Sequence, residues 1–383
     1  MRTKLIRLTV ALPAAVLLLA AAAPALADGW FRTPVPATAQ TQRSVSCWSS
    51  SGCLSVGDTA MRWNGTAWTT ISKPAGTLES VACTSGTFCL AAGQNSTGRA
   101  ATWKWNGAGW KALTTYNPAS AANILYAVKC ASASSCEAVG AHGGWPLAEH
   151  WNGTSWSGQS TYGAPHGALY GVSCESSSAC EAVGANADGT TCSDRFTCPV
   201  APIAMAMGWK VGSKWSVQAT PLQPFLYWNT QDGPGSSNWQ DTAVSCWSSG
   251  CMAVGWQFQS GDPSSTNDAA YAEKWNGKSW SVSQYGIDCG TNNICAQSGG
   301  SALSAVHCSS ASACTAAGLA CDQEGCTEQT AIVTWNGTTW NPVTSPTLPS
   351  ADTWLNGLSC GKVCVAVGSS NQSSPEPAYA IRS

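Results

Sequence analysis

One pattern recurs about seven times in this chain and constrains its fold more than any other feature. Each copy reads Cys-x-Ser-x-x-x-Cys-x-Ala-Val-Gly and is followed later by Trp-Asn-Gly-x-x-Trp. The copies return at intervals of roughly 35 to 70 residues, which is typical of one repeated supersecondary unit. The pattern therefore predicts tandem units rather than one large irregular core, and it argues against a single embedded catalytic motif.

Each copy predicts four antiparallel strands. In the third copy, two β-rich runs, 125–130 and 136–140, flank a turn of small residues, and a third run covers 147–151. Asn152-Gly153 then gives the strongest short-range hairpin signal, and 154–160 follows as a fourth strand. With no helix signal in the rest of the chain, we predict an all-β protein, a seven-bladed β-propeller with four-stranded blades.

The two ends of the repeat array are complementary. The last copy stops after its third strand at Ser383, whereas residues 28–34 precede the first copy as an unpaired strand. We expect the N-terminal strand to close the last blade, because a closed ring removes exposed sheet edges. The predicted blades are about 41–77, 78–120, 123–166, 169–222, 241–285, 302–348 and 354–383 together with 28–36.

The first 27 residues are typical of a secretory signal peptide. A basic start with Arg2, Lys4 and Arg7 precedes an apolar run, and Ala25 and Ala27 form an Ala-x-Ala cleavage site. We predict cleavage after Ala27 and a secreted, extracellular bacterial protein. A retained membrane anchor is the alternative, but no later stretch reaches the ~18 apolar residues that a span needs.

The charge of the chain disfavours nucleic acid as a partner. Eighteen basic and twenty acidic residues give a formal net charge of −2, and only 10% of residues are charged. A nucleic-acid-binding surface needs a cluster of Lys and Arg, which this chain lacks. We expect a monomer that does not associate with membranes after cleavage.

The twenty cysteines form ten close pairs in the sequence. Zinc sites also use paired cysteines, but they need a second pair for each ion, and a disulfide framework suits an exported chain better. The expected bridges are Cys47–Cys53, Cys83–Cys89, Cys130–Cys136, Cys174–Cys180, Cys192–Cys198, Cys246–Cys251, Cys289–Cys295, Cys308–Cys314, Cys321–Cys326 and Cys360–Cys364. Loops this short should each contribute about 2–3 kcal/mol.

Tryptophan is abundant, with 21 residues, and most of it falls in pairs around the Asn-Gly turns. The second indole of each pair is expected on the same face as the first and diagonal to it. Such pairs pack hairpins and blades together, and indoles also stack on sugars. Because the motif recurs in every blade, we favour structural packing.

These motifs resemble a secreted actinobacterial repeat of the form Trp-Asn-Gly-Thr-x-Trp with Leu-x-x-Val-x-Cys and Cys-x-Ala-Val-Gly. The resemblance covers nearly the whole chain after residue 27 and implies a propeller and export, with no settled activity. The turn is also distantly similar to the Asp-box of sialidase-like propellers and to kelch-type propellers. Asn replaces the acid here and is shifted by one position, so this similarity bears on fold and not on hydrolysis.

Insertions fall on one face of the predicted propeller, mostly in blades 4 to 6. They join strands two to three or lead to the next blade, at 185–204, 224–240, 256–268, 286–300 and 319–330. The Cys-x5-Cys and Asn-Gly turns open on the other face and are uniformly short, so that face is expected to be plain. Long loops in a compact domain are often functional, so the insertion face is the predicted binding side.

The candidate ligand-binding residues are aromatic and acidic side chains on that face: Trp145, Trp228, Trp239, Trp256, Asp262, Asp268 and Tyr285. Aromatic platforms with scattered acids suit recognition of a glycan or of a surface protein. Ordinary exposed loops with packing aromatics are the alternative. Calcium could use the acids, but no EF-hand or nonapeptide pattern occurs, so we expect no metal and no cofactor.

Catalysis finds little support in the sequence. No histidine has an evident nucleophile partner, and His150 is expected to be packed beside the tryptophan motif. Glu137 and Glu181 occupy equivalent second-strand positions in neighbouring blades, as a pair of glycosidase carboxylates might. Other blades hold Leu54, Leu90, Met252, Thr315 and Val365 there, so the position is permissive.

The sequence therefore predicts a secreted, non-catalytic binding module. Its expected ligand is a carbohydrate or a cell-surface molecule, bound through the loops of blades 4 to 6. An extracellular protein-interaction or structural scaffold is the main alternative. A glycan-cleaving enzyme of propeller fold is the weakest of the three hypotheses.

Overall fold

The structure is a computed structural model. It describes residues 29–118, 122–186, 203–221, 226–229, 233–259, 269–287, 301–321, 328–346, 353–370 and 376–383. The predicted signal peptide, residues 1–27, lies outside these ranges and stays a prediction. Among the described residues, no helix is long and apolar enough to cross a membrane.

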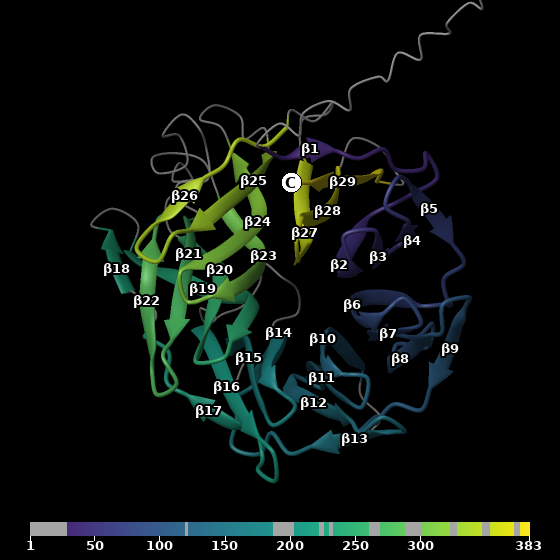
Figure 1. Cartoon of the computed structure of the whole chain (residues 1–383). Coiled ribbons are helices and arrows are strands. Elements are labelled where there is room, and N and C mark those ends of the chain that lie inside the picture. Colours follow the sequence, from purple (N-terminus) through teal and green to yellow (C-terminus); the bar gives the residue numbers. More distant parts are fainter. Residues whose placement is uncertain are drawn as a thin grey trace, which may run out of the picture.

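Seven antiparallel sheets stand around a common axis as the blades of a propeller, as predicted (Figure 1). The first, innermost strands are β2 (Gln42–Ser49), β6 (Thr77–Ser85), β10 (Asn123–Ser132), β14 (Gly167–Ser176), β19 (Gly233–Trp247), β23 (Ser301–Ser310) and β27 (Thr353–Cys360). The second strands are β3 (Gly52–Gly57), β7 (Phe88–Gln94), β11 (Ser135–His142), β15 (Ala179–Asn186), β20 (Gly250–Gln259), β24 (Ala313–Cys321) and β28 (Cys364–Ser370).

The outer two strands of each blade complete the four-stranded unit. The third strands are β4 (Ala60–Trp63), β8 (Ala100–Trp105), β12 (Trp145–Trp151), β16 (Ile203–Lys210), β21 (Ala269–Trp275), β25 (Glu328–Trp335) and β29 (Ala378–Arg382). The fourth strands are β5 (Trp68–Ile71), β9 (Trp110–Leu113), β13 (Trp156–Gln159), β17 (Ser216–Gln218), β22 (Trp280–Tyr285), β26 (Trp340–Pro342) and, in blade 7, β1 (Phe31–Arg32).

The N-terminal strand closes the ring, which confirms the prediction from the two chain ends. Strand β1 pairs antiparallel with β29, with Phe31 opposite Arg382, and blade 7 has the order β1-β29-β28-β27. The backbone N–H of Thr33 also donates to the carbonyl of Ala380 (2.9 Å). Trp68 of blade 1 donates its indole N–H to Thr33 Oγ1 (3.1 Å), so the closing segment is also tied to the first blade.

Blade 5 differs from the prediction in the segment that leads into its first strand. The segment 224–240, expected as a loop, contains β18 (Leu226–Asn229) and the first half of β19. Strand β18 pairs antiparallel with β19 and makes this blade five-stranded. The β18–β19 hairpin therefore extends the sheet in a segment whose irregular composition predicted a loop.

Each blade is stapled between its first and second strands. The structure contains the seven repeat disulfides, and each joins two residues that lie directly opposite each other before a short turn: Cys47–Cys53, Cys83–Cys89, Cys130–Cys136, Cys174–Cys180, Cys246–Cys251, Cys308–Cys314 and Cys360–Cys364. The bridges in blades 5 and 7 close shorter turns than the other five but have the same register. The other three expected pairs fall on residues whose side chains lie outside the description. Bridges in this number fit an extracellular protein.

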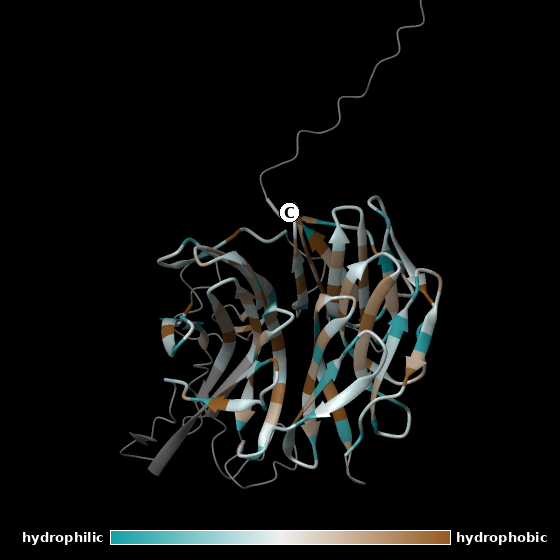
Figure 2. Ribbon diagram, turned by 60° about the horizontal axis from the view of Figure 1, so that its bottom comes forward, coloured by the Kyte–Doolittle hydropathy of each residue, from teal (hydrophilic) through white to brown (hydrophobic). Residues whose placement is uncertain are grey.

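The hydrophobic core lies between successive blades. Leu125 and Val128 of β10 pack with Leu90 and Ala92 of the preceding blade in one buried cluster, which Trp151 completes. The strands accordingly carry apolar residues through much of their length (Figure 2). Both faces of a blade are covered by its neighbours, so its middle strands are buried on both faces, as in Gly52–Gly57.

The Asn-Gly turn has a different geometry from the predicted two-residue hairpin. Four residues, 64–67 in blade 1, separate the two strands, and Gly65 takes the positive φ of +100°. Asn64 contributes its side chain, because Oδ1 accepts from the backbone N–H groups of Thr66 and Ala67 (2.9 Å each). Asn106, Asn152, Asn276 and Asn336 repeat these bonds. The asparagine is an Asx-turn acceptor, and only the glycine supplies the left-handed backbone.

The longer turn changes the tryptophan pairs as well. Trp63 and Trp68 lie directly opposite each other, not diagonally, with ring centroids 5.6 Å apart. Both rings are only 4% exposed. The second indole often bonds to the preceding blade, as where Trp280 Nε1 donates to Gln218 Oε1 (2.7 Å). The burial and these contacts favour the structural role predicted for the pairs.

Candidate functional site

The repeats can be aligned with one another, and the first strands then show which positions the fold fixes. Counting back from the first cysteine, position −2 is always Val or Leu and position −3 is always Ser, Ala or Gly. Position −4 varies most, and its seven occupants are Arg43, Glu79, Tyr126, Tyr170, Thr242, Ser304 and Asn356. All seven are polar or aromatic, although position −3 is small in every blade and position −5 is leucine in five of the seven blades.

A β-bulge lies at position −4 in every first strand. The register with the second strand shifts there by one residue, for example between Gln42 and Ser44 and between Leu125 and Ala127. The same shift occurs in the other five blades. A bulge re-aims the extra side chain relative to the pleat, and all seven bulge residues lie half-buried on the innermost strands around the axis of the ring. We call these seven residues the axis ring.

Neighbouring members of the axis ring, or the strands that carry them, touch around the ring. Arg43 Nε lies 3.4 Å from Glu79 Oε2, and the rings of Tyr126 and Tyr170 are 5.2 Å apart. Thr242 Oγ1 donates to the carbonyl of Leu303 in blade 6. The Asn356 amide donates to the carbonyl of Gln42 in blade 1 (3.0 Å).

The axis ring carries its charge between blades 1 and 2. Arg43 also bonds Asp58 Oδ1 (2.6 Å), which lies in the turn between the second and third strands of blade 1. Burial raises the pKa of Glu79, against the opposing effect of Arg43. The result is a cation between two carboxylates on one side of the axis and a tyrosine pair in the next two blades.

Position −1 is the second variable position on the first strands. In four blades it is serine, whose hydroxyl accepts from the N–H of the first cysteine in the next blade, as Ser46 does from Cys83 (2.9 Å). Blades 3 and 6 replace the serine with Lys129 and His307. Burial and the charge of Lys129 lower the pKa of His307 to about 4, so this imidazole is neutral at physiological pH.

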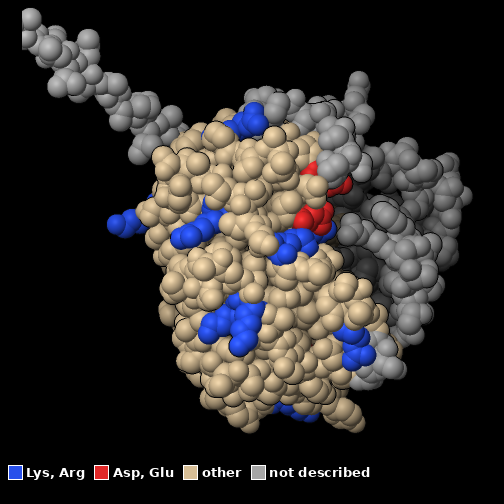
Figure 3. All heavy atoms as spheres, turned by 90° about the vertical axis from the view of Figure 1, so that its right-hand side faces the viewer, with Lys and Arg blue, Asp and Glu red and all other residues tan. Residues whose placement is uncertain are grey.

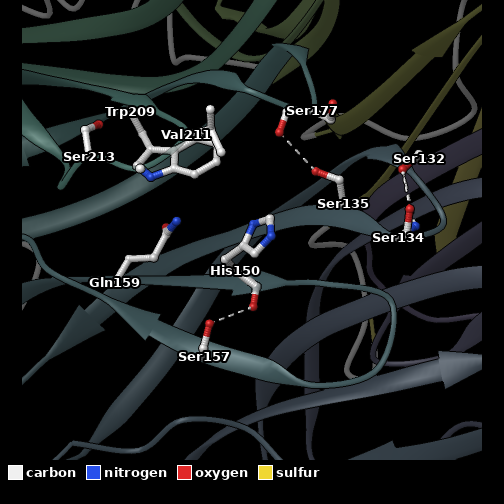
Figure 4. A pocket seen from close by; sticks show the side chains of 11 residues that line it. Ser132, Ser134, Ser135, His150, Ser157, Gln159, Ser177, Trp209, Val211 and Ser213 are labelled. Atoms are coloured by element: carbon white, nitrogen blue, oxygen red, sulfur yellow. Dashed lines mark hydrogen bonds between the residues drawn. The ribbon is translucent and has the colours of Figure 1, made fainter.

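A groove of about 550 Å³ lies between blades 3 and 4, on the face of the short turns (Figure 4). This contradicts the prediction that this face is plain. Its walls are the turn after β10, the end of β12, strand β13 and the two short turns of blade 4. The lining residues are Ser132, Ser134, Ser135, His150, Ser157, Gln159, Ser177, Trp209, Val211, Gly212 and Ser213.

A buried carboxylate holds the histidine of this groove. Glu137 is 1% exposed, and its Oε1 lies 2.6 Å from Nδ1 of His150. Glu137 raises the pKa of His150 through this hydrogen bond, against the opposing effect of burial. Burial also raises the pKa of Glu137, while His150 and Gln159 partly offset the shift by hydrogen bonding. His150 is therefore packed, as predicted, but it is also a fixed polar group of the groove.

The other wall depends on an altered hairpin in blade 4. Five residues, not four, separate Trp209 from Trp215, and their ring centroids are 6.4 Å apart. Trp215 is fully buried and donates its indole N–H to Gln159 Oε1 of blade 3 (2.6 Å). The Trp209 ring lies 5.6 Å from the His150 ring. The extra residue places Val211, Gly212 and Ser213 along the groove.

The predicted ligand-binding residues are only partly described. Trp145 starts β12, is 42% exposed and stacks against His166 at 3.7 Å between ring centroids. Trp256 lies half-buried in β20, and Tyr285 ends β22 with 50% exposure. The backbone of Trp228 and Trp239 belongs to β18 and β19, and Asp262 and Asp268 lie outside the described residues. These assignments stay predictions.

The carboxylates considered for catalysis do not face each other across one site. Glu137 bonds His150 between blades 3 and 4. Glu181 lies between blades 4 and 5, where burial raises its pKa to about 8 and a hydrogen bond with Gln218 opposes the shift. Each carboxylate is engaged by its own blade, so the pair lacks the common geometry of a glycosidase.

The sequence reasoning missed both sites, although each leaves a signal. The axis ring can be found from the sequence by aligning the seven repeats and noting that position −4 varies most among the first strands. The groove is marked by the turn of blade 4, which is one residue longer than the other tryptophan turns. Charge did not indicate a site, because Lys and Arg are scattered over the side seen in Figure 3, with acidic residues beside some of them.

Comparison with solved structures identifies the fold. The chain is similar to the structure titled U3-55K (TM-score 0.57, 10% identity, 93% of this chain and 98% of that one). It is also similar to the WD40 β-propeller domain of Doa1 (0.53, 12%, 93% and 97%) and to a chain of the mitotic checkpoint complex (0.51, 10%, 92% and 94%). No family model and no curated protein matches the sequence. At this identity the likeness shows a propeller with WD40-like neighbours and nothing about the ligand.

Proposed function

We propose that this protein is an extracellular interaction scaffold that binds a segment of another protein at the axis ring. One observation carries the proposal. The first strand repeats its core positions in every blade, yet its bulge position holds Arg, Glu, Tyr, Tyr, Thr, Ser and Asn in turn. A repeat scaffold that varies most at one position on its innermost strands is typical of a recognition surface on a constant frame.

The chemistry of the axis ring favours a peptide over other ligands. Tyrosine and arginine are enriched in protein interfaces, where each combines a large contact area with hydrogen bonding. Ser304 adds a hydroxyl group and Asn356 an amide oxygen, which suit a peptide backbone, while Thr242 is bonded to the neighbouring strand. The arrangement of a cation between carboxylates next to an aromatic pair would give the bound segment a direction. One structural neighbour belongs to a protein assembly, the mitotic checkpoint complex, which is in keeping with this proposal.

Recognition of a glycan by the insertion face remains the second candidate. Its support is the exposure of Trp145 and Tyr285 at the strand ends that lead into that face. Secretion, which both candidates assume, is supported by the seven disulfides.

The test is a selection of peptides from a display library on the protein with residues 1–27 removed. Selected peptides should bind the unchanged protein and lose at least tenfold in affinity with the double variant Tyr126→Ala, Tyr170→Ala. Such a loss is what removal of two central aromatic anchors produces. The control is Tyr162→Ala, because Tyr162 is 84% exposed and lies in the connection after β13, outside the axis ring.

Two results would contradict the proposal. Selection could yield no sequence-specific peptide, or the selected peptides could bind the double variant as tightly as the unchanged protein. Circular dichroism of both variants should match that of the unchanged protein, so that lost binding reports on the surface and not on folding.

A further inference from the structure

The groove between blades 3 and 4 contains polar groups that the packing of a propeller does not require. At the position of Glu137, five other blades carry apolar residues or threonine: Leu54, Leu90, Met252, Thr315 and Val365. Burying a charged pair generally gives no advantage in stability over apolar packing of similar volume. The Glu137–His150 pair therefore calls for an explanation other than the stability of the blade.

The pair fixes the direction of the histidine ring. Because Nδ1 faces the Glu137 carboxylate, the other ring nitrogen, Nε2, points away from Glu137, and the imidazole lies in the wall of the groove (Figure 4). This is the arrangement by which proteins set the tautomer and orientation of a histidine that has a task at its other nitrogen. Gln159 is fixed in the same way, since its Oε1 accepts from Trp215.

The rest of the lining defines the class of ligand. Six serines surround the groove, and Trp209 contributes an indole ring. None of the residues that line it is Lys, Arg, Asp or Glu, and the charge of His150 is balanced by Glu137 behind it. A concave surface with an indole, hydroxyls, an amide and an imidazole, and with no unbalanced charge, suits a neutral ligand rich in hydroxyl groups.

We infer that this groove is a second binding site, which takes a neutral saccharide unit. The imidazole of His150 and the amide of Gln159 would bond its hydroxyls, and the indole of Trp209 would contact an apolar face of the sugar ring. A volume of about 550 Å³ lies within the range of small-molecule sites, about 300–1,000 Å³. The site is on the face opposite to the insertions and does not depend on peptide binding at the axis ring.

The experiment uses an array of neutral mono- to tetrasaccharides of glucose, galactose, mannose and N-acetylglucosamine, followed by calorimetry with the best ligand. Ser157→Trp fills the groove from an exposed position on β13. Ser281→Trp is the matched control. Ser281 holds in blade 5 the position that Ser157 holds in blade 3, directly after the second tryptophan of the pair. Its hydroxyl donates to the carbonyl of Lys274, as that of Ser157 donates to the carbonyl of His150. We expect affinity to fall at least tenfold with Ser157→Trp and to stay within twofold with Ser281→Trp.

A second variant separates occlusion from recognition. His150→Ala opens the groove, so it should also weaken binding at least tenfold if Nε2 bonds the sugar. The inference is overturned if none of these saccharides binds, or if Ser157→Trp and Ser281→Trp behave alike. Sugar binding should persist in the Tyr126→Ala, Tyr170→Ala variant; its loss there would place the sugar at the axis ring and overturn the assignment to the groove.

Discussion

Two neighbouring blade contacts place a buried carboxylate at the same position and treat it differently. Between blades 3 and 4, Glu137 lies beside His150, and between blades 4 and 5, Glu181 lies beside Gly208. In both, a fourth-strand glutamine accepts from the tryptophan of the next blade, Gln159 from Trp215 (2.6 Å) and Gln218 from Trp280 (2.7 Å). The two contacts share this hydrogen bond and differ in the third-strand residue opposite the glutamate, which is His150 in blade 3 and Gly208 in blade 4.

That residue decides whether the carboxylate has a cationic partner. Glu137 has the imidazole of His150, whereas Glu181 is hydrogen-bonded by the neutral Gln218 and feels the charge of Lys210 only as a lesser effect, and burial raises the pKa of Glu181 to about 8. The first contact therefore holds a polar ring in a groove, and the second holds a carboxyl group that keeps its proton at neutral pH. A repeat fold can thus change the chemistry of one contact through a single side chain, without altering the strands.

The largest expected effect comes from removing the histidine. His150→Ala should lower the free energy of unfolding by about 2–4 kcal/mol at pH 6, because Glu137 stays buried without its cation and a void replaces the ring. The folded-state pKa of His150 is raised, so the pair contributes fully below the unfolded pKa, about 6.5, and less as pH rises through the folded pKa. Urea unfolding at pH 6 and pH 9 measures both effects.

Lys274→Ala is the control for this variant. Lys274 holds the position of His150 in blade 5 but is a surface cation, 5.8 Å above the ring of Trp247. Its removal should cost less than about 1 kcal/mol at either pH. Equal losses for the two variants would show that the Glu137–His150 pair contributes nothing particular to this contact.

The second-largest effect is the loss of stability expected when a side chain is added at Gly208. A Cβ added there would crowd the amide nitrogen of Gln218 and lie 3.0 Å from Oε2 of Glu181. Gly208→Ala should therefore displace the amide, weaken its bond to Trp280 and cost about 1–3 kcal/mol. Gly361→Ala is the control, since a Cβ at Gly361 meets nothing within 4 Å. An unaffected Gly208→Ala would mean that this contact has room for a larger side chain.

A third, smaller effect concerns the proton on Glu181. Its folded-state pKa of about 8 exceeds the usual 4.5, so the native state retains a proton that the unfolded chain loses, and stability falls as pH rises from about 4.5 to 8. Glu181→Gln removes this dependence. The loss of stability between pH 5 and pH 8.5 should shrink by about 2 kcal/mol relative to the unchanged protein, roughly half of the ~4 kcal/mol that the full shift implies, because the partly exposed carboxyl group is screened by water. A pH profile of urea midpoints that is identical for both proteins would contradict the buried, protonated state.

The sequence predicted the fold well because the fold depends on features that repeat. Cysteine spacing, the Val at position −2 and the tryptophan turns each occur in most blades, so a single misreading matters little. The complementary chain ends predicted ring closure for the same reason, and β1 and β29 do pair. The turn geometry was wrong, because Asn-Gly was taken for a two-residue hairpin when the asparagine side chain closes a four-residue one.

The candidate sites were harder to predict because they depend on exceptions. No local rule places Arg43 and Tyr126 around a shared axis, since their partners come from different blades. Glu137 and His150 are 13 residues apart, and only the pairing of β11 with β12 puts them side by side. Long loops and exposed aromatics drew the prediction towards the insertion face instead.

The smallest effect is the most direct test of what distinguishes the two contacts. Glu137→Gln replaces the carboxylate with a neutral amide, so the pKa of His150 should fall from its raised value, as followed by NMR titration of its ring protons. Glu149→Gln is the control: Glu149 adjoins His150 in sequence but is bonded by the backbone N–H of Tyr116 on the opposite face of the blade. A pKa of His150 that responds equally to both changes would mean that general burial, and not the Glu137 hydrogen bond, sets the state of the imidazole in the groove.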